Sequence, residues 1–99
     1  MPIDVEWQDE DGETLARYDG PLVTVTLVER ADPTSCCLRF IDPWGNTIFN
    51  QQQLPVLVHE LEAIESRTPD GQREAIHALL AFLRPACDQV HTYIKFIGD

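Results

Sequence analysis

The sequence has no apolar run long enough to cross a membrane. None of its hydrophobic stretches approaches the ~20 residues that a transmembrane helix needs. Its first residues, M-P-I-D-V-E, contain neither the basic region nor the apolar core of a signal peptide. We therefore expect a cytoplasmic protein that does not act at a membrane.

Cysteine is scarce. The chain has three, an odd number, with Cys36 and Cys37 adjacent and no C-x-x-C pair. This pattern excludes a disulfide framework and favours reduced thiols in a reducing compartment. If residues 36–41 form a strand, Cys36 and Cys37 point to opposite faces, and a buried thiol is the favoured reading over a nucleophile.

Basic residues are few. Seven Lys and Arg face seventeen Asp and Glu, which gives a formal net charge of −10. A phosphate backbone or an anionic membrane would be repelled, so we expect no nucleic-acid partner and no membrane partner. The charge has two readings that stay open here: solubility, or attraction of a cationic protein.

Catalytic and metal-binding motifs are missing as well. His59-Glu60 begins like the zinc-protease pattern H-E-x-x-H, but position 63 is alanine. The acidic run D-E-D-G-E at 9–13 lacks the ligand spacing of a calcium loop. We find no glycine-rich phosphate loop and no G-x-S-x-G. We therefore predict no cofactor and no metal, and a binding protein rather than an enzyme. Three histidines and three cysteines leave a zinc site as a minor alternative.

What is present describes one globular domain over residues 1–99. Hydrophobic residues make up 43% and charged residues 24%, which are globular values. Residues 3–8 alternate between apolar and polar, as a strand does. A turn at Asp11-Gly12 would place Trp7 opposite Ala16 and Glu6 opposite Arg17. A reversal at 20–21 would then start a third strand at 22–28.

The central stretch, residues 38–50, predicts a hairpin. Asp42-Pro43-Trp44-Gly45 has turn chemistry, with Asp42 accepting from the turn's own amides and Gly45 in the left-handed conformation. The paired residues would then be Phe40 with Ile48 and Leu38 with Asn50 on the core face, and Arg39 with Phe49 and Ile41 with Thr47 on the outer face.

Two helices and a last strand follow. The first helix carries an apolar stripe of Leu54, Leu57, Val58, Leu61 and Ile64. We place its start at Pro55 and prefer this to a capping box formed by Asn50 and Gln53. The second stripe is Ile76, Leu79, Leu80, Leu83, Cys87 and Val90, and Pro85 either kinks that helix or begins a new one. Residues 91–97 alternate as a strand of unassigned position.

These elements predict an α+β fold: an antiparallel meander of five or six strands, with both helices packed on one face. That face would carry Val5, Trp7, Val23, Val25, Leu38 and Phe40.

The segment L-R-F-I-D-P-W-G-N-T-I-F-N at 38–50, with the Leu/Glu helix after it, resembles small uncharacterised bacterial proteins. Proteins of this kind are found on mobile gene cassettes or beside toxin genes. The resemblance covers roughly a third of the chain and carries no catalytic motif. It implies a bacterial origin and no activity. Size and charge alone also resemble the immunity proteins of toxin pairs.

Three functional hypotheses from different classes remain. The first is an acidic protein-binding module, for example an immunity-like inhibitor of a basic partner. The second is a homodimer, which is compatible with the first. The third is a small-molecule-binding protein or enzyme with a pocket between helices and sheet. For the first two, the outer sheet face and the turn predict a partner interface formed by Arg39, Ile41, Asp42, Trp44 and Phe49.

Overall fold

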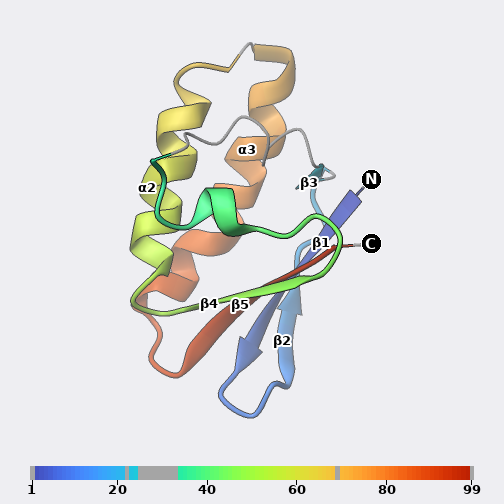
Figure 1. Ribbon diagram of the computed structural model, residues 1–99, viewed down its shortest axis with the longest axis vertical. Helices are drawn as coiled ribbons and strands as arrows, with labels where there is room; N and C mark the ends of the chain where they lie inside the picture. Colours follow the sequence, from blue (N-terminus) through green and yellow to red (C-terminus); the bar gives the residue numbers. More distant parts are fainter. Residues whose placement is uncertain (1, 22, 25–33, 69, 99) are drawn as a thin grey trace.

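Two helices pack on one face of an antiparallel sheet in the computed structural model of the chain (Figure 1). The structure describes residues 2–21, 23–24, 34–68 and 70–98. The α+β class predicted from the sequence is therefore confirmed, with both helices on the same side of the sheet.

The strand order differs from the predicted meander. The sheet runs β2 (Thr14–Arg17), β1 (Pro2–Asp9), β5 (Thr92–Ile97), β4 (Asn46–Asn50), and all neighbours are antiparallel. The short β3 (Val23–Thr24) pairs with the start of β1, off this path. The prediction of a five- or six-stranded meander is wrong, because the last strand of the chain enters the middle of the sheet, between β1 and β4.

The β1–β2 hairpin forms with the predicted pairs, Glu6 with Arg17 and Trp7 with Ala16. Its turn is one residue longer than predicted. The amide of Asp9 donates to the carbonyl of Glu13 (2.9 Å), and Gly12 closes the loop with φ of 82°. The register shifts between Trp7 and Gln8, a bulge that reconciles the longer loop with the predicted pairs.

The chain after β2 does not reverse onto it. Tyr18 still bonds to β1, its amide donating to the Val5 carbonyl (2.9 Å); the chain leaves β1 at residues 19–21 and returns, so that β3 pairs with Pro2 and Ile3. The Tyr18 hydroxyl donates to the carbonyl of Pro21, and its ring lies against Gly20, where a Cβ would approach within 2.7–2.8 Å. The predicted pairing of a third strand with β2 is therefore wrong. Leu22, Val25 and Val28 lie outside the described residues.

The predicted central hairpin does not form either. Residues Leu38–Phe40 are a short 3-10 helix, η1, in which the Phe40 amide donates to the carbonyl of Cys37 (3.0 Å). The strand β4 pairs instead with β5, through Asn46–Ile97 to Asn50–Tyr93.

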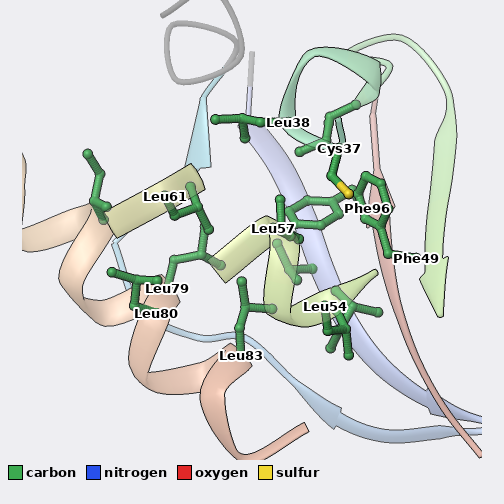
Figure 2. Packing of buried hydrophobic residues seen from close by; sticks show 14 of the residues in the cluster. Cys37, Leu38, Phe49, Leu54, Leu57, Leu61, Leu79, Leu80, Leu83 and Phe96 are labelled. Carbon is green, nitrogen blue, oxygen red and sulfur yellow. The ribbon is translucent and has the colours of Figure 1, made fainter. Parts of the chain in front are cut away.

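Helix α2 (Leu54–Glu65) follows the predicted stripe and buries Leu54, Leu57, Leu61 and Ile64. The helix begins at Leu54, one residue before the predicted start at Pro55. The Asn50 and Gln53 side chains each accept from the other's amide, at 3.0 and 2.9 Å, as in a capping box, but they do so in the turn that precedes the helix. Pro55 still lies in the first helical turn, where its missing N–H costs no helical bond. Figure 2 shows Leu54, Leu57 and Phe49 directed into one cluster.

Helix α3 (Asp70–Leu83) ends before Pro85, and a 3-10 helix, η2 (Arg84–Asp88), begins there. The open question at Pro85 is thus resolved in favour of a new short helix. Val90 is 70% exposed and leaves the predicted stripe. The predicted alternation of the last strand is confirmed in β5 (Thr92–Ile97), because Thr92, Ile94 and Phe96 are buried and the residues between them are only partly buried.

Candidate protein-binding surface

The turn from Asp42 to Gly45, here called the Trp44 turn, is built as the sequence predicts around Asp42. One carboxylate oxygen of Asp42 accepts from the Trp44 amide (2.9 Å), and the Asp42 carbonyl accepts from Gly45 (3.4 Å). The Asp42 amide donates to the Thr47 hydroxyl on β4 (2.8 Å). The turn is therefore fixed from within and tied to the strand that follows it.

Glycine is required at two positions here for closeness of approach. A Cβ at Gly45 would lie 2.8 Å from the Asp42 carboxylate, and one at Gly98 would lie 2.5 Å from the backbone of Pro43. Gly98 donates to the Gly45 carbonyl (2.6 Å) and so fastens the turn to the end of β5. Gly45 is not left-handed, which corrects the prediction. Among the described glycines only Gly12 has positive φ.

The Trp44 turn exposes a large apolar side chain to solvent, because Trp44 is 67% exposed. Two further exposed apolar residues belong to the same stretch of chain, Phe40 at 58% and Ile48 at 54%. The Arg39 guanidinium lies over the Phe40 ring, 4.4 Å from its centroid, and its Nε donates to the Ser35 carbonyl (2.7 Å). Phe40 was predicted to be in the core, and its exposure corrects that.

Two of the five predicted interface residues are core residues. Ile41 is 3% exposed and Phe49 4%, so their predicted placement on an outer face is wrong. Pairing with β5 puts Phe49 opposite Ile94, and its ring meets Phe96 edge-on at 5.8 Å (Figure 2). Because side chains alternate along a strand, Ile48 then points to the open face. The surface retains Arg39, Asp42 and Trp44 from the prediction.

Glu60 is the structural residue that the sequence reasoning missed. Its carboxylate accepts the backbone amides of Cys36 (2.6 Å), Cys37 (3.2 Å) and Leu38 (2.9 Å), which are otherwise unpaired at the start of η1. The sequence did contain a sign of this role. Glu60 lies three residues after Leu57 and four before Ile64, which places its carboxylate beside the apolar stripe of α2 and not on the solvent side of the helix. Glu60 therefore fixes the position from which residues 39–44 project.

Two of the three thiols, Cys37 and Cys87, are poorly suited to nucleophilic chemistry. Burial, and then the charges of Glu60 and Cys36, raise the pKa of the Cys37 thiol. Burial and then Asp88 raise the pKa of Cys87. Cys36 is exposed, whereas Cys37 is buried beneath η1. A raised pKa keeps a thiol neutral, and the neutral form is a poor nucleophile and metal ligand.

Hollows on the surface offer little for a small molecule. One of about 320 Å³ lies between η1 and α2, lined by His59, Glu60, Arg67 and their neighbours. The Glu60 carboxylate there is occupied by three amides, and Arg67 Nε donates to the Ala63 carbonyl (3.2 Å). Two charged groups on this hollow, those of Glu60 and Arg67, are thus already bonded to the protein. This weakens the small-molecule hypothesis.

The acidic charge is gathered away from the Trp44 turn. Seven of the seventeen acidic residues fall within residues 1–20, together with a single arginine. Arg17 pairs with Glu6 at 3.4 Å, and His91 reaches Glu10 at the hairpin tip, 3.1 Å away. Within the described part of the chain, no group of three or more His, Cys, Asp and Glu residues is arranged to hold a metal.

In the described ranges, no helix has both the length and the apolar character to span a bilayer. Comparison of the chain with protein-family models, curated proteins and solved structures finds no match. We therefore infer function from the residues and geometry of the chain itself.

Proposed function

We propose that this chain is an acidic protein-binding module that presents the Trp44 turn to a protein partner. One observation carries the proposal: a tryptophan two-thirds exposed on a turn that is fixed by its own hydrogen bonds. Tryptophan and arginine are enriched among the residues that dominate binding energy at protein interfaces. A turn that is already ordered loses little conformational entropy on binding, which favours affinity.

Neighbouring residues extend the surface. Phe40 and Ile48 add exposed apolar area on either side of the turn in the sequence, and Arg39 covers one ring with its guanidinium. Asp42 is exposed beside them and supplies a polar edge. An apolar centre with polar groups around it is the usual anatomy of a protein interface.

The acidic β1–β2 hairpin supports a finer form of this proposal, in which the partner is a basic protein. Seven acidic residues within residues 1–20 would raise the association rate with such a protein, and salt would reduce that effect. An immunity-like inhibitor encoded beside a toxin would work in this way.

The test is affinity capture from a bacterial lysate with wild type, Trp44→Ala and Val90→Ala. The captured protein is then purified and its affinity for each variant measured by calorimetry. Val90 is the matched control, because it is 70% exposed and lies outside the proposed surface. We expect Trp44→Ala to weaken binding about 30-fold or more, the effect of losing a hot spot of ~2 kcal/mol, and Val90→Ala to leave it unchanged. Equal binding by all three proteins would refute the proposal.

A further inference from the structure

The outer edge of β4 is an unpaired strand edge among the described residues. The bond from the Gly98 amide to the Gly45 carbonyl sets the phase of the β4–β5 ladder. In an antiparallel ladder hydrogen-bonded and non-bonded pairs alternate. Thr47 and Phe49 therefore bond to β5, while the backbone groups of Asn46, Ile48 and Asn50 face away from it. The Asn50 amide confirms this phase, since it donates to the Gln53 side chain.

In the part of the chain that the structure describes, this edge is covered only at Asn50, whose amide donates to the Gln53 side chain (2.9 Å) and whose carbonyl accepts from the Gln53 amide (3.1 Å). Natural sheets guard exposed edges with lysine, proline, bulges or a covering element, because an open edge pairs with other chains. Between Asn46 and Asn50 there is no charge, no proline and no register shift. Residues 43–59 contain no Asp, Glu, Lys or Arg at all. The opposite edge, β2, has both a bulge in its pairing with β1 and an exposed arginine, Arg17.

We propose that β4 pairs antiparallel with β4 of a second copy, across a two-fold axis between the two Ile48 residues. This rests on the proposed function and names the occupant of the surface beside the Trp44 turn. The sequence Asn46-Thr47-Ile48-Phe49-Asn50 suits such an axis. With Ile48 opposite its counterpart, each Asn46 lies opposite an Asn50, and these side chains share the open face.

The backbone groups fit the same register. Each Ile48 amide meets the Ile48 carbonyl of the second copy. Each Asn46 amide meets an Asn50 carbonyl that already accepts from Gln53 (3.1 Å) and takes it as a second donor, while the Asn50 amide keeps its bond to the Gln53 side chain. The same alignment brings the Trp44 turn of each copy beside residues 51–53 of the other, a stretch of three glutamines with no charge. Dimer formation would therefore bury both Ile48, against its counterpart, and Trp44, against residues 51–53 of the second copy.

The distribution of charge allows a second copy at this edge. Two molecules of formal charge −10 repel wherever their acidic surfaces meet. The proposed dimer has one continuous sheet, in which the order β2-β1-β5-β4 of one copy is followed by β4-β5-β1-β2 of the other. The two acidic hairpins therefore lie at opposite ends of that sheet. With strands ~4.8 Å apart, the two β2 strands are about 30 Å from each other. That is well beyond the screening length of ~8 Å at physiological salt.

The first experiment is sedimentation velocity over a concentration series with wild type, Ile48→Lys and Leu15→Lys. Lysine is a natural edge guard, and Leu15 is the matched control, 59% exposed on the β2 strand. We expect wild type and Leu15→Lys to dimerise, and Ile48→Lys to need at least tenfold more protein to do so. Circular dichroism and thermal melts confirm that each variant is folded.

The second experiment does not depend on the lysine variant folding. In a Cys36→Ser background, Ile48→Cys should form an intermolecular disulfide on mild oxidation, because facing Cα atoms of a bonded pair lie ~5.5 Å apart. Asn46→Cys in the same background should not, because its counterpart lies opposite Asn50.

A wild type that stays monomeric at all concentrations overturns the second copy as occupant. So does a dimer that Ile48→Lys leaves unaffected and that the Ile48→Cys variant does not cross-link. If wild type is monomeric while a captured protein still depends on Trp44, the binding-module proposal stands and only the dimer falls. If Trp44→Ala also changes nothing in capture, both fall.

Discussion

At the scale of single residues, Glu60 has the largest effect on how the surface is built. One carboxylate satisfies three consecutive amides, those of Cys36, Cys37 and Leu38. A carboxylate accepting several backbone amides substitutes for the missing partners at a helix start. Glutamine could accept with only one oxygen and would turn an NH₂ group toward donors.

We therefore expect Glu60→Gln to lower the free energy of unfolding by ~1 kcal/mol, the lower end of the cost of leaving amides unsatisfied, because two of the three bonds are only partly buried and the third is exposed. Glu62→Gln is the control. It lies on the same helix and loses only a half-exposed ion pair with Arg84, 3.0 Å long. Urea titration of both variants measures the difference. Equal stability would mean that water replaces the carboxylate at no cost.

The three thiols should separate by reactivity toward iodoacetamide. Cys36 is exposed and should react first, Cys87 more slowly, and Cys37 last, because burial and raised pKa both oppose its thiolate. The Cys37 rate should begin to climb only at higher pH than that of an ordinary thiol. The raised pKa also means that folding stability falls as pH rises past the unfolded thiol's value, near 9.0. Peptide mass spectrometry over time gives each rate, and rapid labelling of Cys37 in the folded protein would contradict this.

At the scale of elements, the apolar stripe of α2 holds the helix layer to the sheet. Leu61 is fully buried, whereas Val56 on the same helix is 40% exposed. We expect Leu61→Ala to cost ~2–5 kcal/mol of unfolding free energy through lost burial and a cavity. Val56→Ala should cost under ~1 kcal/mol, as partly exposed positions do. Chemical denaturation measures both costs, and a value for Leu61→Ala below about half a kcal/mol would show that the helix does not pack as described.

Local chemistry was readable from the sequence at this scale, and long-range pairing was not. The periodic stripes of α2 and β5, the Asp42 turn and the β1–β2 pairs all follow from neighbours in the chain. The hairpin predicted at 38–50 fails because two distant partners compete for its halves. The Glu60 carboxylate accepts the amides at the start of η1, and β4 pairs with β5. Both partners are more than twenty residues away in the sequence.

The same competition explains the candidate surface. Trp44 could be predicted because a rigid turn presents it whatever pairs beside it. The burial of Ile41 and Phe49 could not be predicted. Phe49 lies on the other face because β4 pairs with β5 and not with residues 38–41, and Ile41 lies in no strand, since it directly follows η1. Ile48, which the sequence placed in the core, is consequently the exposed one.

At the scale of the whole molecule, the acidic residues are unevenly distributed. Acidic residues crowd the β1–β2 end, and the β4 end is uncharged over residues 43–59. Repulsion among acidic side chains that lie close together lowers the free energy of unfolding. Salt screens this repulsion, and its effect is larger for clustered charges than for the same charges spread evenly over the surface.

We expect the melting temperature to rise as salt increases from about 0.01 M to about 1 M, because the screening length falls from ~30 Å to ~3 Å. Neutralising the hairpin tip with Asp11→Ser and Glu13→Gln should reduce this rise. Glu74→Gln on α3 should not, since it lies outside the crowded region. Calorimetric melts at each salt concentration provide the measurement. An identical salt response in all variants would place the repulsion elsewhere.

The central position of β5 determines when the fold can be completed. Among the described residues, β1 and β4 do not pair with each other and are joined through β5 (residues 92–97), which emerges after both of them during synthesis. Until β5 is available, only the β1–β2 hairpin can pair and β4 has no partner strand. The apolar faces of α2 and α3 then have no complete sheet to pack on. Pairing across such long separations makes folding slow and leaves strand edges open to other chains. A ribosome-bound chain halted before residue 92 should therefore be cleaved readily by protease. Once residues 92–97 have left the ribosome, the whole domain should resist cleavage.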